Sequence, residues 1–217
     1  MVLDEVLDKD IINVIINEDY ERLIKLCGHP KDILYYLYEK NLLDERAFKL
    51  CIKHYCKITS SCINKFIIDE KEEYLNPIFD TLSMNTVQCE EINKSDHNGN
   101  LPLIIACKYN KTAIAFRLIK IGAKILVKDS DGNTPLVHAC HYNNYDLIAY
   151  LIENNKNIIN VQNNKGNTVL HLSSISGNIK LFKYLIDHNA DFKITNKNNK
   201  KPLEILGEGY KILKEVH

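Results

Sequence analysis

The chain has 217 residues, of which 45% are hydrophobic, so it is long enough to bury a substantial core. Its 28 lysine and arginine side chains balance 28 aspartate and glutamate side chains, which gives a formal net charge of zero. This balance argues against a nucleic-acid-binding module, which ordinarily has a basic surplus, although it leaves room for a local basic patch.

Cysteine content and segment lengths predict the compartment. Seven cysteines are an odd number in a chain that is not short, which favours free thiols in a reducing environment over a disulfide scaffold. The N-terminus, residues 1–5, is acidic where a secretory signal would be basic, and no apolar run is long enough to span a membrane. We therefore expect a cytoplasmic protein without a membrane partner, or one in a host cell's cytosol if it is an effector.

The first ninety residues have the apolar pattern of helices but no recurring phrase. The polar stretch 86–94 is expected to link this region, residues 1–90, to the rest. Two interpretations stay open: degenerate helix pairs that continue the repeats described below, which we favour, or a separate small helical domain. The predicted helices cover residues 10–17, 19–27, 31–40, 44–57, 60–69 and 73–83.

A group of cysteine and histidine side chains in this region invites comparison with a zinc site. Cys51 and His54 are spaced for one helix face, but Cys56 and Cys62 do not form the second pair that a structural zinc site usually has. Buried cysteine also packs as a small hydrophobic residue. We therefore expect no metal and no cofactor, and keep an enzyme or metal site in the N-terminal half as the alternative.

The second half contains one eight-residue phrase four times, at residues 96–103, 129–136, 163–170 and 196–203. The copies begin 33, 34 and 33 residues apart, which is the period of a stacked helical repeat. In such a solenoid each unit packs only on its neighbours.

Each position of the phrase has a structural purpose. The fourth position needs a turn residue with positive φ, and it holds Gly99, Gly132, Gly166 and finally Asn199. Thr134 and Thr168 are placed as helix N-caps, and proline often follows at the first helical position. A leucine then points inward, with a small residue three positions later that lets helices approach. These are Leu103, Leu136, Leu170 and Leu203, then Ala106, Ala139 and Ser173.

A second apolar stripe of helical period follows in each unit. It ends at Gly122 in the first unit and at Asn189 in the third, as a helix C-terminus commonly does. From about residue 91 onward, the chain resembles the ankyrin-repeat family, because the four copies agree in turn, cap and core. It departs from the family pattern at Leu101, where threonine is typical, and at Val169, where proline is typical.

The resemblance implies an all-α ankyrin-repeat solenoid of stacked helix–turn–helix units with short β-turn or hairpin fingers. The units would be residues 96–128, 129–162 and 163–195, with a truncated cap at 196–217. Ankyrin proteins contact partners through the finger tips and the exposed flank of each first helix. In this chain those positions are His97, Asn98, Asn100, Lys108, Tyr109, Ser130, Asp131, Asn133, His141, Tyr142, Asn164, Lys165, Asn167, Ile175 and Ser176.

Two tyrosines stand out in this set. Tyr109 and Tyr142 occupy equivalent repeat positions, so we expect their rings to stack along the groove as interface anchors. The alternative is that they support the contact between fingers and helices, since tyrosine is often only half-buried.

Other reactive side chains have ordinary structural interpretations. His138 and His141 lack a third ligand for a metal, and by the resemblance His171 bridges adjacent turns. Cys107 and Cys140 recur at equivalent positions, which favours packing over catalysis. A basic strip of Lys124, Lys128, Lys193, Lys197, Lys200 and Lys201 is expected to be a solvated rim, with an acidic or phosphorylated partner as the alternative.

The sequence therefore predicts a non-catalytic scaffold or adaptor that binds another protein through its concave face. It is expected to be a monomer that binds no nucleic acid. A self-associating solenoid is a further possibility.

Overall fold

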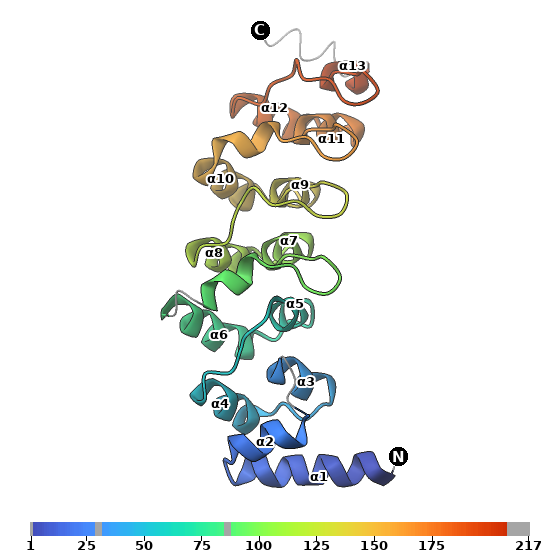
Figure 1. The fold of residues 1–217 in the computed structure, drawn as a ribbon. Helices are drawn as coiled ribbons and strands as arrows, with labels where there is room; N and C mark the ends of the chain where they lie inside the picture. Colours follow the sequence, from blue (N-terminus) through green and yellow to red (C-terminus); the bar gives the residue numbers. More distant parts are fainter. Residues whose placement is uncertain (1, 29–31, 85–87, 208–217) are drawn as a thin grey trace. The chain divides into compact units, whose positions relative to one another are not determined.

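The computed structural model describes residues 2–28, 32–84 and 88–207, without the side chains of residues 2–6, 84, 88 and 89. The chain divides into two compact units, Met1–Asn98 and Gly99–His217. Every described regular element in both units is helical (Figure 1). This confirms the predicted all-α class.

The first unit contains six α-helices and a short 3₁₀ helix. Each expected helix is present, although the first begins earlier and the fourth ends earlier than the apolar pattern indicates. The bounds are α1 (Val2–Ile16), α2 (Tyr20–Leu26), α3 (Ile33–Glu39), α4 (Glu45–Lys53), α5 (Ser60–Ile68), α6 (Glu72–Met84) and η1 (Gln88–Asn93).

The 3₁₀ helix η1 lies inside the stretch that the sequence indicated as a polar link. Its Ile92 is buried, and η1 packs against α5 and α6. Only Cys89 and Ile92 are hydrophobic among its six residues, too few to define a helical period, which is why the sequence pattern did not predict this element. Residues 85–87, the first part of the expected link, lie outside the described residues.

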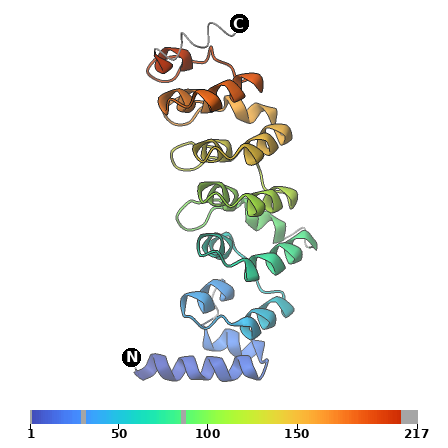
Figure 2. The same cartoon turned by 180° about the vertical axis from the view of Figure 1, so that it is seen from behind.

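The second unit is a stack of helix pairs. The first helices are α7 (Pro102–Lys108), α9 (Pro135–His141), α11 (Val169–Ile175) and the terminal α13 (Pro202–Leu206). The second helices are α8 (Thr112–Lys120), α10 (Tyr145–Asn154) and α12 (Ile179–Asp187), with the 3₁₀ helix η2 (Lys156–Asn160) after α10. Within this unit the first helices form one column and the second helices another (Figures 1 and 2).

The core of the second unit lies where the sequence predicts it. Leu103, Leu136 and Leu170 are buried, as are the small residues three positions later. These small side chains let α7 pack on α9 and α9 on α11. Leu203 is only half-buried, because α13 is the last described helix of the stack.

One turn motif ends the first helix of each helix pair in both units. After each first helix a residue adopts positive φ, and the next backbone N–H donates to the carbonyl five residues earlier. This is the helix stop known as the Schellman motif. It recurs at Glu18, Asn41, Glu70, Asn110, Asn143 and Gly177.

The fingers are turns that precede the first helices, and they are held by side chains rather than by strands. In the second finger, Asp129 Oδ1 accepts hydrogen bonds from the N–H groups of Asp131 (3.0 Å) and Asn133 (2.8 Å). In the third, Asn163 Oδ1 accepts in the same way from Lys165 and Asn167, both at 3.0 Å. The predicted turn residues Gly99, Gly132, Gly166 and Asn199 all have positive φ.

Adjacent fingers are also bonded to each other. The N–H of Asn164 donates to the carbonyl of Asp131 at 2.9 Å, and the N–H of Lys197 donates to the carbonyl of Lys165 at 3.1 Å. This close approach leaves no room for a side chain at Gly132, where an added Cβ would lie 2.7 Å from the backbone nitrogen of Asn164.

We predict that Gly132→Ala destabilises the protein more than Gly177→Ala does. Both glycines have positive φ, so each alanine should cost about 1 kcal/mol of backbone strain. Only at Gly132 does the new methyl group also overlap a neighbouring finger, which should raise the loss to about 3 kcal/mol. Urea unfolding measures both; equal losses would contradict the role of the finger contact.

Candidate functional site

Three exposed side chains line the ends of the first helices in the second unit. Tyr109 and Tyr142 are the C-cap residues of α7 and α9, and Ile175 is the last residue of α11. Their exposed fractions are 44%, 46% and 59%, large values for side chains of this size and polarity. Because α7, α9 and α11 pack in sequence, we call these three residues the apolar row.

The two tyrosines of the row do not stack as the sequence suggested. Among the described residues no ring contact joins Tyr109 and Tyr142. The Tyr142 hydroxyl instead donates to the carbonyl of Lys108 at 3.0 Å, and its ring meets the edge of His141 at 5.2 Å between centroids. That hydrogen bond ties α9 to the end of α7 and directs the ring. Tyr142 therefore combines an exposed face with a supporting contact.

Most of the other expected contact residues are exposed on the finger tips and first helices. Asn164 is exposed, but its side-chain amide donates to the carbonyl of Ser130 at 2.8 Å. The Asn164 side chain therefore takes part in the contact between fingers. Besides the apolar row, the expected contact residues that are exposed in the second unit are Lys108, Ser130, Asp131, His141, Asn164, Lys165 and Ser176.

The fifth residue of each phrase does not belong on this surface. Asn167 is buried, and its Oδ1 accepts a hydrogen bond from Asn196 at 2.9 Å. Asn133 is half-buried and accepts from Asn163, also at 2.9 Å. This corrects the expectation for both residues: each ends a finger immediately before a helix N-cap, where its side chain joins successive units. Asn100, the fifth residue of the first finger, is half-buried.

The first finger crosses the boundary between the two compact units. His97 and Asn98 belong to the first unit, where both are exposed. The His97 ring meets the edge of Tyr35 at 6.4 Å between centroids, and Asn98 contacts a His97 ring nitrogen at 3.1 Å.

His171 has the bridging role that the family resemblance implied. Its ring Nδ1 accepts from the N–H of Thr168, while Nε2 contacts the carbonyl of Lys200 in the next finger at 3.1 Å. Burial lowers the pKa of His171, an effect that the bond to the Lys200 carbonyl partly opposes. The buried ring is therefore held in its neutral form.

His138 is also used inside the stack. Its Nε2 lies 2.9 Å from Asp129 Oδ2, so the ring braces the finger that precedes its own helix. Burial lowers the pKa of His138, although the Asp129 carboxylate favours the charged ring. His141 is exposed beside the apolar row, so the two histidines do not converge on one point.

The buried cysteines are poorly suited to nucleophilic chemistry. Burial raises the pKa of Cys107 to about 12 and raises that of Cys140 further. A nucleophile at neutral pH needs the thiolate, which these environments disfavour. The positions of both residues next to the small core residues favour packing.

Four cysteines of the first unit, Cys27, Cys51, Cys56 and Cys62, are similarly enclosed. Cys51 and Cys62 are fully buried, burial raises the pKa of Cys62, and His54 stacks on the ring of Tyr20 at 4.7 Å between centroids. Within residues 2–28, 32–84 and 88–207, no three histidine, cysteine or acidic side chains are arranged to hold a metal ion. No helix in those ranges is long and apolar enough to cross a membrane.

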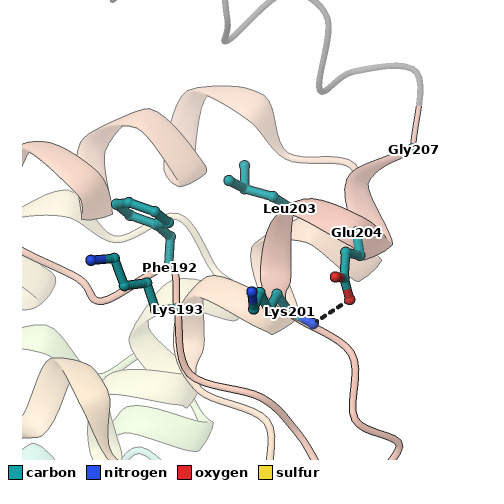
Figure 3. Close-up of a pocket in the computed structure, with 6 residues that line it drawn as sticks. All are labelled: Phe192, Lys193, Lys201, Leu203, Glu204 and Gly207. Carbon is teal, nitrogen blue, oxygen red and sulfur yellow. Dashed lines mark hydrogen bonds between the residues drawn. The ribbon is translucent and has the colours of Figure 1, made fainter.

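A hollow of about 660 Å³ lies at the C-terminal end of the second unit (Figure 3). Phe192 and Leu203 form its apolar part, and Glu204 accepts a hydrogen bond from the N–H of Lys201 at 2.9 Å. Its lining contains no histidine, cysteine or hydroxyl group that could act as a nucleophile. The hollow is suited to holding an apolar side chain near positive charge. Phe192, Lys193, Lys201, Leu203, Glu204 and Gly207 line it.

Part of the exposed apolar pattern lies outside the residues that the sequence predicted. Ile16 and Ile68 end the first helices α1 and α5 of the first unit, and they are 55% and 38% exposed. They occupy the same place in their helix pairs as Ile175 does in its own. The signal available in the sequence was an isoleucine directly before an expected helix break.

Comparison with known proteins identifies the family. A family model of three ankyrin repeats matches residues 24–160 and 103–196, which together cover well over half of the chain. The chain belongs to the ankyrin-repeat family. Ankyrin repeats are generally protein–protein interaction modules and are typically non-enzymatic.

Several proteins share parts of this ankyrin chain. It is 34% identical over 119 residues to alpha-latrocrustotoxin-Lt1a of Latrodectus tredecimguttatus, 54% of the chain and 8% of the toxin. It is 40% identical over 63 residues to a putative ankyrin repeat protein of Rickettsia bellii, 28% of the chain and 10% of that protein. It is 29% identical over 144 residues to ankyrin repeat protein OPG189 of Variola virus, 66% of the chain and 25% of the viral protein. The matched regions therefore span a quarter or less of these relatives.

We predict that Val137→His stabilises the protein by about 1 kcal/mol, because it improves the N-terminal cap of α9. Thr134 is the N-cap of α9, but its buried Oγ1 has no hydrogen-bond partner, whereas Thr168 and His171 form a reciprocal capping box on α11. Position 137 is equivalent to 171, so a histidine there can pair with Thr134. Urea unfolding measures the gain, with His171→Val as the reverse change; a loss of stability in Val137→His would contradict the prediction.

We also predict that His171 makes stability fall in acid. Its folded pKa lies below the ordinary value of 6.5, so its contribution is complete above that value and is lost as the pH falls toward the folded pKa. The difference in unfolding free energy between wild type and His171→Gln should therefore narrow from about pH 7.5 to about pH 5.5. A difference that is constant across this range would contradict a neutral buried ring.

Proposed function

We propose that this ankyrin-repeat protein is a non-catalytic scaffold or adaptor that binds a partner protein through the apolar row and the adjoining finger tips of its second unit. The observation that carries this is the row itself, in which three consecutive first helices each expose one large side chain at their C-terminal end, at the C-cap in α7 and α9 and one residue earlier in α11. A soluble stack has no structural need for exposed side chains of this kind at repeated positions. Aromatic side chains in such a place are typical anchors of protein interfaces.

The framework around the row supports this role. Finger-to-finger hydrogen bonds and the Schellman turns hold the backbone, so that an exposed residue can change without loss of the fold. A rigid surface also loses little conformational freedom on binding, which favours affinity.

We also propose that residues 1–90 are degenerate helix pairs of the ankyrin kind, and that the repeats of the second half begin near residues 96, 129, 163 and 196. Two observations support this proposal. In the first unit, the first helix of each pair ends with the same left-handed turn as in the second unit. The family match begins at residue 24.

We predict that the double variant Tyr109→Ala/Ile175→Ala loses at least tenfold in affinity for proteins that wild type captures from cytosol. Among the described residues, neither of these two side chains forms a hydrogen bond or a ring contact, so their removal should leave stability almost unchanged. Tyr142 is left in place because its hydroxyl supports α7.

A matched control is Tyr55→Ala/Leu126→Ala, which removes two comparably exposed side chains away from the row. Unfolding curves and circular dichroism should be the same for both double variants. Partners that bind the two equally well would refute the proposed surface.

A further inference from the structure

The zero net charge of the chain conceals a strong separation of charge between its two units. Residues 1–98 hold 12 basic and 19 acidic side chains, a formal charge of −7, and residues 99–217 hold 16 basic and 9 acidic ones, a formal charge of +7. The second unit therefore has the electrostatic character of a surface that attracts anionic partners.

The positive charge increases along the fingers. The second finger, residues 129–133, contains two aspartates and no lysine. The third, 163–167, has Lys165 as its one charged residue, and the fourth, 196–200, has Lys197 and Lys200. All three lysines are exposed, and among the described residues none of them forms an ion pair. Their charges are available to a ligand.

Part of this change of charge comes from asparagine in place of aspartate at the first residue of the last two fingers. Asn163 and Asn196 hold their turns as Asp129 does: Asn196 Oδ1 accepts from the N–H groups of Asn198 at 2.9 Å and Lys200 at 3.1 Å. Aspartate makes the same bonds within its own turn, as it does at position 129, but only the amide of asparagine also donates to the preceding finger, at 2.9 Å from Asn163 and from Asn196. Asparagine at both places therefore removes negative charge beside the lysines without altering the turn.

The lysine-bearing fingers are also fixed relative to each other. The N–H of Lys197 donates to the carbonyl of Lys165, and Asn196 is bonded to Asn167 of the preceding finger. The lysine stems thus project from a rigid base, which lowers the conformational cost of binding.

Beyond the fourth finger lies the hollow of Figure 3, with Phe192 43% exposed and facing Leu203. Lys193 and Lys201 add two more exposed cations at this hollow. The acidic groups beside them, Asp191 and Glu204, each accept a hydrogen bond from a backbone N–H, at 2.8 and 2.9 Å.

We propose that the last two fingers bind an acidic polypeptide segment of the partner, whose carboxylates contact Lys165, Lys197 and Lys200. An apolar side chain of the same segment occupies the hollow between Phe192 and Leu203. This inference rests on the proposed function, because it names the chemistry of the partner that reaches the apolar row. Lysine attracts carboxylates as a point charge, so the contact depends on ionic strength.

The test uses a labelled peptide of Glu-Glu-Leu repeats, with a Gln-Gln-Leu peptide of the same length as control. In a polyproline II segment every third side chain faces the same side and lies about 9 Å from the last. That spacing matches the roughly 8–10 Å between packed helices, so successive leucines can meet successive units. Fluorescence anisotropy on the full chain should show the glutamate peptide binding at least tenfold more tightly, with the difference shrinking as salt is added.

Charge reversal then locates the site. Lys165→Glu/Lys197→Glu/Lys200→Glu should reduce affinity for the glutamate peptide at least tenfold. Lys120→Glu/Lys156→Glu/Lys180→Glu changes the net charge equally, but on exposed positions of α8, η2 and α12, and should have a much smaller effect. Equal losses in the two variants, or equal binding of the two peptides by wild type, would overturn the proposal.

Two further outcomes identify a different occupant and also overturn it. Wild-type chains that self-associate in sedimentation at low salt, but not with the finger lysines reversed, would place the acidic unit of a second copy here. An oligonucleotide that displaces the glutamate peptide at lower concentration would indicate nucleic acid.

The same variants separate this inference from the proposed function. Loss of captured cytosolic partners with Tyr109→Ala/Ile175→Ala, without any loss with the finger lysines reversed, would leave the apolar row as the binding surface and refute only the acidic partner. Retention of those partners by both variants would refute both proposals.

Discussion

The left-handed residue after each first helix is the constraint on which the rest of this structure depends. It reverses the chain within a few residues and satisfies carbonyl groups that would otherwise lack partners at the helix end. Because the reversal happens at the same place in each pair, the last residue or C-cap of each first helix reaches the surface in a repeated position. Tyr109 and Tyr142 are exposed as C-caps, and Ile175 is exposed one position earlier, the position that Ile16 and Ile68 take in the first unit.

The helical class, the turn residues of the repeats and most of the core of the second unit could be predicted from the sequence. Glycine or asparagine in a left-handed turn and leucine followed by a small residue are local requirements, so they can be recognised without coordinates. The first unit was harder to recognise. At the position of Ala106 it has larger residues, Val14, Leu37 and Phe66, and its left-handed turns use Glu18 and Glu70, which sequence rules do not anticipate.

The candidate surface could be predicted only in part, because exposure depends on partners in neighbouring units. Asn133 and Asn167 look like finger-tip residues in the sequence, yet each accepts a hydrogen bond from the finger that follows. Tyr142 likewise has a hydroxyl partner one unit away, which no local pattern specifies. Charge separation was missed for another reason: it is visible only when the charges are counted separately for each compact unit, and that boundary comes from the structure.

The equivalence of aspartate and asparagine in the finger turns has an evolutionary consequence. The two side chains differ by one atom and its hydrogens, and the bonds within the turn use only the oxygen they share, whereas the amides of Asn163 and Asn196 also donate to the preceding finger. Exchange of asparagine for aspartate, by a single nucleotide change or by slow chemical deamidation, alters the electrostatic character of a tip and removes its amide bond to the preceding finger, while the bonds within the turn remain. Relatives with superimposable folds can in this way diverge in the partners that they bind, and a comparison of backbones alone would not reveal the difference.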